Sequence, residues 1–331
     1  MSHPFEGLPT TPTAEELVDK AFSRASRAGG AKDGNEAQQS MLMTASNIAS
    51  DNMENVVTAW PTIDDLDPFY VELADAVVGE AYPADDDPGI DALKQHLSEI
   101  SWAADKVVEI RQEYESRVAR GDIDTARKLR KQAFARIADV VEEVEDDLAA
   151  ISTAHNALKD IPDIRPNEPA IVVAGYPNVG KSSFVNRVTR ADNEIASYPF
   201  TTTQIRVGHF EDQRIRYQLV DTPGLLDRPP EDRNEIESQA VSALEHLADA
   251  VLVFIDPSGE CGYPLADQLE LRNAIEARFD VPVLTIANKS DLSTDVEADH
   301  YMSVTEDDNV DGVLQAAIDA VDYELELPFD E

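Results

Sequence analysis

The sequence predicts an all-α helical-bundle domain followed by an α/β domain, in which helices flank a mostly parallel six-stranded sheet. Three observations lead to this fold class. The first half of the chain carries apolar residues at helical spacing, as expected for buried helix faces. The proline-rich residues 161–168 cannot continue a helix. Beyond them, short apolar runs alternate with helical segments, which is typical of a parallel sheet.

These changes of pattern divide the 331 residues into five segments. We expect a partly mobile N-terminal segment at 1–40, a helical domain at 41–160, a linker at 161–168, the α/β domain at 169–323 and an acidic tail at 324–331. The apolar runs of the α/β domain are 170–174, 214–220, 250–255 and 281–287, with a shorter one at 300–302. The length of the chain allows two domains.

Two helices can be placed more closely. Thr13 and Glu16 have the spacing of a capping box, which predicts a helix within residues 14–27. The clearest apolar stripe lies in the helical domain, where either Asp122 or Asp124 can cap the helix that carries it. The stripe consists of Ala126, Leu129, Ala133, Ile137, Val140, Val144, Leu148 and Ile151.

The chain is strongly acidic, with 66 acidic against 27 basic residues and a net charge of −39. The acids are spread over both halves and do not form one long tail. This spread favours a surface adapted to a cytoplasm of molar salt, where charge repulsion is screened; an ordinary acidic protein is the alternative. One cysteine excludes an intramolecular disulfide framework, and no apolar run reaches the ~18 residues of a membrane span. We expect a soluble, cytoplasmic protein without membrane contact.

A phosphate-binding loop follows the first predicted strand and precedes a predicted helix. It matches the pattern GxxxxGK[ST], in which backbone amides and a helix N-terminus surround phosphates. Lys181 is expected to reach the β- and γ-phosphates, and the Ser182 hydroxyl to bind Mg²⁺. The residues concerned are Gly175, Tyr176, Pro177, Asn178, Val179, Gly180, Lys181 and Ser182, followed by Ser183.

Further motifs lie at the C-terminal ends of later strands, where ligands of such sheets bind. Asp221 follows the run 214–220 and can hold Mg²⁺, and the Gly224 amide can contact the γ-phosphate. Between the phosphate loop and this strand, Phe200 and Thr201 precede Thr202. We expect Thr202, with Thr201 as the alternate, to bind Mg²⁺ and the γ-phosphate only while the triphosphate is present.

The base is predicted by a motif after the run 281–287, in which Asn288 and Lys289 precede Asp291. A carboxylate at Asp291 can accept hydrogen bonds from guanine N1–H and N2. Adenine presents an acceptor at N1 and would leave the carboxylate without its partners. Ser303 and Val304 would complete the pocket through their backbone. The motifs together predict a P-loop GTPase domain that binds GTP and GDP.

Hydrolysis is expected to be slow. Leu225 stands where many GTPases carry a glutamine that orients water, and a leucine cannot do so. Arg228 and Arg233 could assist in cis, although ordinary ion pairs are the simpler interpretation of both. The residues that we expect to act in catalysis are Lys181, Asn178, Thr202 and Gly224.

These residues resemble the nucleolar GTP-binding protein 1 family of Obg-related, translation-factor-class GTPases over about residues 40–323. The motifs that carry the resemblance are 175–182, 198–202, 221–234, 261–263 and 65–70. The resemblance implies a helical domain before the GTPase domain and a role in assembly of the large ribosomal subunit. The chain looks like an archaeal-type short form from a halophile, without the long C-terminal extension of eukaryotic members.

The resemblance also bears on Asn178. In related GTPases with asparagine at this position, the side chain helps to hold K⁺ beside the β,γ-bridge, where it acts as an arginine finger does. Asn178 can equally be a residue that simply tolerates the turn. Stimulation by K⁺, by the ribosome or by both would then raise the slow intrinsic rate.

The helical domain carries the densest basic stretch of the chain, which would be a face for ribosomal RNA and a large-subunit precursor. Pairing of these residues with neighbouring acids is the alternative, and no DNA partner is expected. The stretch consists of Arg117, Arg120, Arg127, Lys128, Arg130, Lys131 and Arg136. We expect Arg127, Lys128, Arg130 and Lys131 to be available to phosphates.

The function predicted from the sequence is a GTP-binding and GTP-hydrolysing switch in large-subunit assembly. One alternative is a ribosome-binding scaffold with GTP as a structural ligand, which would still support assembly after Lys181→Ala. Another is a translation-associated GTPase like those of the Obg and Drg groups, which the motif at residues 65–70 argues against.

Overall fold

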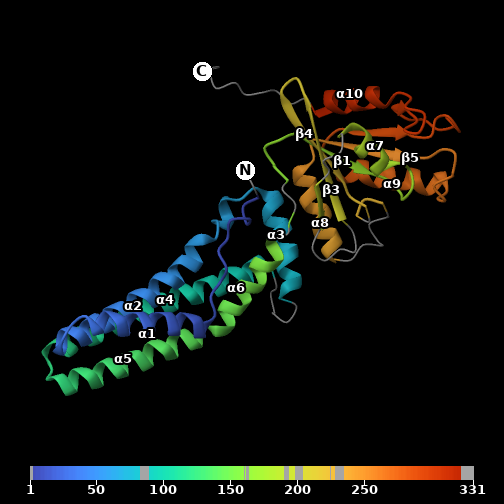
Figure 1. Ribbon diagram of the computed structural model, residues 1–331. Coiled ribbons are helices and arrows are strands. Elements are labelled where there is room, and N and C mark those ends of the chain that lie inside the picture. The colour runs from blue at the N-terminus through green and yellow to red at the C-terminus, as the bar shows by residue number, and fades with distance from the viewer. Residues whose placement is uncertain are drawn as a thin grey trace, which may run out of the picture. The chain divides into compact units, whose positions relative to one another are not determined.

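The computed structural model describes residues 3–82, 89–159, 161, 164–189, 194–197, 204–223, 225–227 and 235–321. They form two compact units (Figure 1). The helical unit comprises Pro4–Asp65 and Val77–Lys159, and the α/β unit consists mainly of Leu66–Ala76 and the described residues after Lys159. The predicted order, a helical domain before an α/β domain, is confirmed. Within the described ranges, no helix is long and apolar enough to cross a membrane.

The helical unit consists of long helices that run alongside one another (Figure 1). Its central helix is α2, which packs against α1, α4 and α5, while α6 packs against α4 and α5. Fully buried side chains such as Leu42, Met53 and Ile100 fill the space between them. The helices are α1 (Ala14–Gly30), α2 (Gly34–Ala59), α4 (Ile90–Arg120), α5 (Ile123–Glu143) and α6 (Glu145–Leu158), and η1 (Ile63–Asp65) is a short 3-10 turn.

The predicted apolar stripe is confirmed, because all eight of its side chains are buried. It lies on two helices, however, since α5 ends at Glu143 and α6 begins at Glu145 with Val144 between them. The first turn of α6 carries three acidic residues. Negative charge is favourable at a helix N-terminus and unfavourable at a C-terminus, so these acids stabilise a new helix start at this point.

The N-terminal segment is more ordered than the sequence indicated. The capping box is present, with Glu16 N–H donating to Thr13 Oγ1 at 3.2 Å and Thr13 N–H to Glu16 Oε2 at 3.0 Å. The helix continues to Gly30, and α2 begins at Gly34, well before residue 41. Packing of α1 against α2 buries Leu17 and outweighs the low helix propensity of these glycine- and serine-rich residues.

The α/β unit contains a seven-stranded sheet among the described residues, one strand more than predicted. Its order is β2-β3-β4-β1-β5-β6-β7. The five strands from β4 to β7 are parallel, and β2 and β3 add an antiparallel edge. The strands are β1 (Ala170–Ala174), β2 (Glu194–Ser197), β3 (Gln204–Asp212), β4 (Ile215–Asp221), β5 (Ala250–Ile255), β6 (Val283–Ala287) and β7 (His300–Tyr301).

Helices cover both faces of this sheet (Figure 1). They are α7 (Lys181–Val188), α8 (Glu235–Leu247), α9 (Leu265–Arg278) and α10 (Val310–Val321). Contacts between α7 and α10 place these two helices on the same side, and α9 packs against β5 and β6. The buried strands β1 and β5 form the centre of the core, with Phe184 of α7 and Phe254 of β5 in ring contact at 5.3 Å.

Residues 66–76 correct the predicted division of the chain. The sequence placed them in the helical domain, whereas they group with the α/β unit. They include the first part of α3 (Pro68–Ala81), in which Phe69 is fully buried. The Tyr70 hydroxyl donates a hydrogen bond to the Ile164 carbonyl, and Glu72 accepts one from His246 at 2.8 Å. The family motif at 65–70 therefore anchors this segment to the α/β unit.

The end of the predicted linker is held against the sheet by one buried glutamine. Gln218 of β4 is fully buried, and its Oε1 accepts from Arg165 N–H at 2.8 Å. Its Nε2 donates to the carbonyl oxygens of Arg165 at 2.8 Å and Glu168 at 3.0 Å. The side chain therefore supplies the hydrogen bonds that these backbone groups lack within the sheet.

We predict that Gln218→Met lowers the free energy of unfolding of the α/β unit by about 1–3 kcal/mol, because it removes three part-buried hydrogen bonds to the backbone of Arg165 and Glu168 at nearly constant volume. Urea unfolding would measure the loss. Gln315→Met on α10, where the side chain is exposed, is the control and should stay within about 0.5 kcal/mol of wild type. Equal stability of the two variants would contradict this account of the linker.

Candidate functional site

The phosphate loop connects β1 to α7 through two glycines that tolerate no side chain. Gly175 has φ +128°, and a Cβ there would lie 2.3 Å from the Phe254 carbonyl oxygen. Gly180 has φ +107°, and a Cβ there would lie 2.1 Å from Asn288 Nδ2. Both positions require glycine for conformation and for space. The loop so formed ends at the N-terminus of α7, the end of a helix that attracts anions.

Lys181, the first residue of α7, is buried and folded back over the loop. Its Nζ donates to the carbonyl oxygens of Gly175 at 2.5 Å and Tyr176 at 2.8 Å. Burial lowers the pKa of Lys181, and the nearby charge of Asp221 opposes this effect in part. An anion bound in the loop would stabilise the charged ammonium further.

Ser182 and Asp221 meet where β4 ends beside the loop. The Ser182 hydroxyl donates to Asp221 Oδ2 at 2.5 Å. The other oxygen, Oδ1, is buried and has no hydrogen-bond partner within the described part of the chain. Burial raises the pKa of Asp221, while the bond from Ser182 and the charge of Lys181 act against it. A hydroxyl beside a carboxylate with a spare oxygen fits a hard cation such as Mg²⁺.

Asn288 connects the phosphate loop to the predicted base-recognition segments, which are the loop of Asn288, Lys289 and Asp291 and the residues Ser303 and Val304. Its Nδ2 donates to the Val179 carbonyl at 2.8 Å, and its Oδ1 accepts from Val304 N–H at 3.2 Å. Ser303, next to Val304, is buried and bridges to Asp308. The structure thus brings together three predicted segments that lie far apart in the sequence.

Asp291 and Lys289 follow Asn288 in the same loop. The Asp291 side chain is exposed. Lys289 has φ +58°, and its Nζ donates to Asp256 Oδ2 at 2.6 Å. Asp256 was not among the predicted site residues. Its place directly after β5, at the same edge of the sheet as the other motifs, is the signal that could have identified it.

The remaining loop residues are also described. Pro177 is half-buried, Val179 is buried and Ser183 is exposed. Asn178 is exposed with φ +63°, a conformation that asparagine tolerates better than most residues. This geometry is compatible with both interpretations of Asn178.

Part of the predicted switch machinery lies outside the described residues, namely Phe200, Thr201, Thr202, Gly224, Arg228 and Arg233. Leu225 is described and is fully buried. Its N–H donates to the Thr222 carbonyl at 3.2 Å, and the next carbonyl, of Leu226, accepts from Gly175 N–H at 2.9 Å. The Leu225 side chain therefore belongs to the core.

The basic stretch of the helical unit divides into inward-facing and outward-facing residues. Arg130 is half-buried, lies over the Phe134 ring at 4.9 Å and donates from Nε to Gln38 Oε1 at 2.8 Å. Burial lowers its pKa. Arg136 forms an ion pair with Glu113. Arg130 is therefore only partly available to phosphates, because Gln38 of α2 and Phe134 of α5 contact its side chain.

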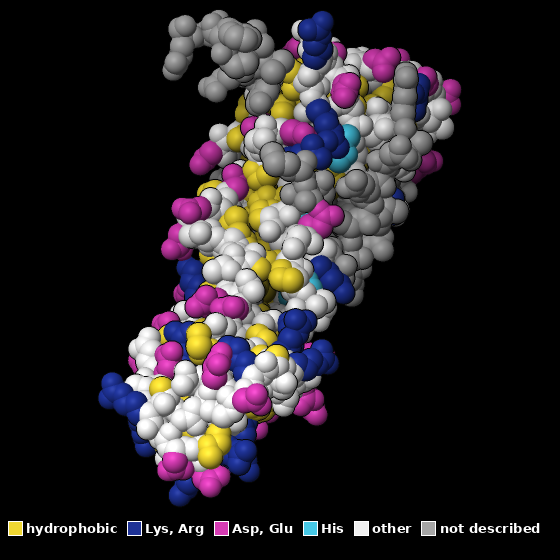
Figure 2. Space-filling model, turned by 60° about the vertical axis from the view of Figure 1, so that its left-hand side comes forward, with side chains coloured by type: hydrophobic (Ala, Val, Ile, Leu, Met, Phe, Trp, Pro, Cys, Tyr) yellow, Lys and Arg dark blue, Asp and Glu magenta, His cyan; other side chains and the backbone are white. Residues whose placement is uncertain are grey.

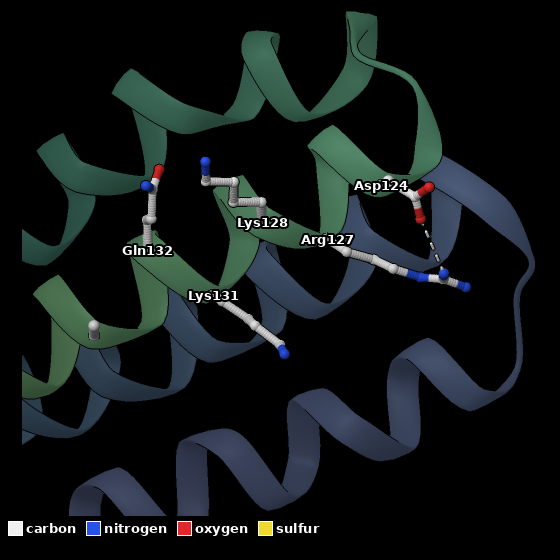
Figure 3. Close-up of a pocket in the computed structure, with 6 residues that line it drawn as sticks. Asp124, Arg127, Lys128, Lys131 and Gln132 are labelled. Atoms are coloured by element: carbon white, nitrogen blue, oxygen red, sulfur yellow. Dashed lines mark hydrogen bonds and ion pairs between the residues drawn. The ribbon is translucent and has the colours of Figure 1, made fainter.

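The outward-facing residues line a groove on α5 of about 510 Å³. Lys128 and Lys131 are exposed and point to different sides of the helix, and Arg127 is paired with Asp124 at 3.4 Å (Figure 3). Elsewhere on the helical unit, lysine and arginine are interspersed with acids (Figure 2). Contacts within the protein thus account for Arg127, Arg130 and Arg136, whereas Lys128 and Lys131 are exposed.

Comparison with known proteins finds relatives of this chain and a protein family that matches both of its domains. Residues 5–165 match the model of the NOG1 N-terminal helical domain, and residues 235–291 match that of nucleolar GTP-binding protein 1 (NOG1). An uncharacterised protein of Methanocaldococcus jannaschii is 36% identical over 306 residues, which cover 88% of this chain and 82% of that protein. Nucleolar GTP-binding protein 1 of Arabidopsis thaliana is 33% identical over 299 residues.

The Arabidopsis match covers 87% of this chain but only 43% of the plant protein, so the chain spans less than half the length of that relative. A solved structure described as nucleolar GTP-binding protein 1 of Plasmodium falciparum is 32% identical; the match covers 49% of this chain and 90% of that one, with a TM-score of 0.44. On the strength of both family models and the archaeal relative, the chain belongs to the nucleolar GTP-binding protein 1 family.

Proposed function

We propose that the protein binds GTP and hydrolyses it to GDP and phosphate. The observation that carries this proposal is the arrangement at the end of β4, where Ser182 contacts an Asp221 whose second, buried oxygen has no hydrogen-bond partner among the described residues. Lys181 lies beside this pair with its ammonium on loop carbonyl groups. A magnesium–triphosphate ligand would satisfy all three side chains at once.

Each residue has a distinct role in this proposal. Lys181 exchanges the carbonyl groups of its own loop for the β- and γ-phosphate oxygens. Ser182 and Asp221, together with Thr202 from the segment outside the described residues, hold Mg²⁺, which would neutralise charge on the phosphates. The Asp291 carboxylate selects guanine by accepting hydrogen bonds from the N1–H and N2 groups of the base.

Slow unaided hydrolysis follows from the buried side chain of Leu225. A side chain held in the core cannot orient an attacking water. The rate then depends on electrostatic stabilisation of the transition state by other groups. Lys181, Asn178, Thr202 and Gly224 are the candidates within the chain, and a bound partner is the candidate outside it.

The choice of base is tested by Asp291→Asn. We expect GDP affinity to fall about a hundredfold, because the amide keeps one neutral acceptor oxygen and sets a donor against a donor of guanine in place of the second. The new amide can donate to the C2 carbonyl of xanthine, so affinity for XDP should rise. Fluorescent nucleotides report both constants. Asp295→Asn, an equivalent change at another exposed acid of the same loop, is the control; equal effects of the two variants on GDP would refute the assignment.

We propose further that K⁺ at Asn178 accelerates hydrolysis. Asn178→Gly separates the two interpretations of this residue, because glycine keeps the φ of +63° while removing the carboxamide. The wild type should hydrolyse GTP at least about tenfold faster in KCl than in NaCl of equal ionic strength. The variant should bind GTP normally and lose this difference. If Asn178→Gly still hydrolyses GTP faster in KCl than in NaCl, the carboxamide does not hold K⁺ and Asn178 serves only to form the turn.

The proposed partner is a large-ribosomal-subunit precursor, contacted through ribosomal RNA. Two findings support this: the relatives carry the name nucleolar GTP-binding protein, and the α5 groove presents exposed Lys128 and Lys131 on an otherwise acidic chain. Contacts of lysine with phosphate weaken as salt rises, because counterions compete. In molar salt, stacking and shape would have to contribute as well.

We predict that Lys128→Glu with Lys131→Glu weakens binding to large-subunit RNA at least about tenfold and lowers the slope of log affinity against log salt by about 2. Filter binding over a KCl series measures both. Lys20→Glu with Lys106→Glu changes the net charge equally elsewhere on the helical unit. If Lys20→Glu with Lys106→Glu weakens RNA binding as much, binding depends on the net charge of the chain and the assignment to α5 is refuted.

A further inference from the structure

A carboxylate that the proposed mechanism does not use is buried next to the base-recognition loop. Asp256 is the first residue after β5 and is 0% exposed. Its Oδ1 accepts from the Ser258 backbone N–H at 2.9 Å and from the Ser258 hydroxyl. Its Oδ2 accepts from Cys261 N–H at 2.8 Å and from Lys289 Nζ at 2.6 Å. Both oxygens are thus fully used by donors.

These donors determine the charge of the group. Burial alone would raise the pKa of Asp256, but the hydrogen bonds from Lys289, Ser258 and Cys261 outweigh burial and lower it. The carboxylate is therefore ionised at neutral pH. A buried anion is tolerated only with such partners, and one of them is the lysine of the base-recognition motif.

The loop that follows Asp256 is itself held in place. Gln268 of α9 accepts from Asp256 N–H at 2.7 Å and donates to the Tyr263 carbonyl at 2.9 Å. The Tyr263 ring contacts that of Tyr176 in the phosphate loop, with centroids 4.5 Å apart. Residues 256–263 thus touch the phosphate loop at one end and the base-recognition loop at the other.

Lys289 is placed by this loop and by its own backbone. The preceding Asn288 N–H donates to the Ile255 carbonyl at 2.9 Å, which attaches the base-recognition loop to the end of β5. The Lys289 side chain is 21% exposed, so its ammonium lies inward on Asp256 while part of the side chain faces solvent. Methylene groups held in this way present an apolar surface to a planar ligand.

We propose that Asp256 is a positioning residue for guanine-nucleotide binding, which holds the Lys289 side chain so that its stem flanks the bound base. The proposal rests on the proposed function. Without the carboxylate, the ammonium can move to solvent or to one of the many surface acids of a chain with net charge −39. Binding would then have to order a mobile side chain, which weakens affinity.

The two partners are not equivalent. When Lys289 is replaced, Asp256 keeps its donors from Ser258 and Cys261, so the loop retains its conformation. When Asp256 is replaced, Lys289 loses its ion pair. If Asp256 acts through Lys289, the effects of the two replacements on GDP release are therefore not additive. If replacement of Asp256 disturbs the fold in general, it accelerates release whether or not Lys289 is present.

The test measures dissociation of a fluorescent GDP from the full chain in KCl. Asp256→Asn should release GDP about tenfold faster than wild type, since most affinity changes appear in the dissociation rate. Lys289→Met should release it at least as fast. The double variant should match Lys289→Met within about twofold. Asp256→Ser, which places no amide donor opposite Ser258, serves as the second variant if Asp256→Asn does not fold.

Asp249→Asn is the matched control. Asp249 precedes β5 at its other end and accepts from Ala170 N–H at 2.8 Å, so it is a partly buried carboxylate distant from the motifs. It should release GDP at the wild-type rate. Two results would refute the inference and leave the proposed function intact. One is release of GDP from Asp256→Asn at the wild-type rate. The other is that Asp256→Asn accelerates release equally in the wild-type and Lys289→Met backgrounds. A wild-type chain that does not retain GDP would refute the proposed function and the inference with it.

Discussion

The site depends on the close approach of Asn288 to Gly180. The amide of Asn288 bonds the Val179 carbonyl on one side and the Val304 N–H on the other, and only glycine leaves room for it at position 180. Three loops that leave different strands are joined by this one side chain. Because the strands are parallel and end at the same edge, a small number of hydrogen bonds suffices to connect them.

Charge is arranged differently inside the site and outside it. The surface is dominated by acids, whereas Lys181 and Lys289 direct their ammonium groups into the protein, onto carbonyl groups and a buried carboxylate. A cation in such a position is shielded from surface acids and from salt. Salt is therefore expected to weaken contacts of the exposed Lys128 and Lys131 on α5 more than the contacts of Lys181 and Lys289.

Local patterns were the part of the structure that could be predicted. Gly175, Lys181, Asp221 and Asn288 belong to short motifs whose spacing reflects backbone geometry, so their placement at strand ends followed from the sequence. Arg130 could not be assigned, because its contacts with Gln38 and Phe134 depend on how α5 packs. Asp256 was missed for a related reason. Its position after β5 was visible in the sequence, but its contact with Lys289, which lies 33 residues away, was not.

The grouping of residues 66–76 with the α/β unit has a consequence for how such a protein can evolve. The chain leaves the helical unit, contributes Phe69 and Tyr70 to the other unit, and then returns before the linker. Each unit is therefore built from segments that are discontinuous in the sequence. Recombination at the linker would separate this segment from the groups that it covers. The two units are thus expected to be inherited together. Replacement of either one as a continuous stretch of sequence would remove residues 66–76 from the α/β unit or insert them into an unrelated helical unit.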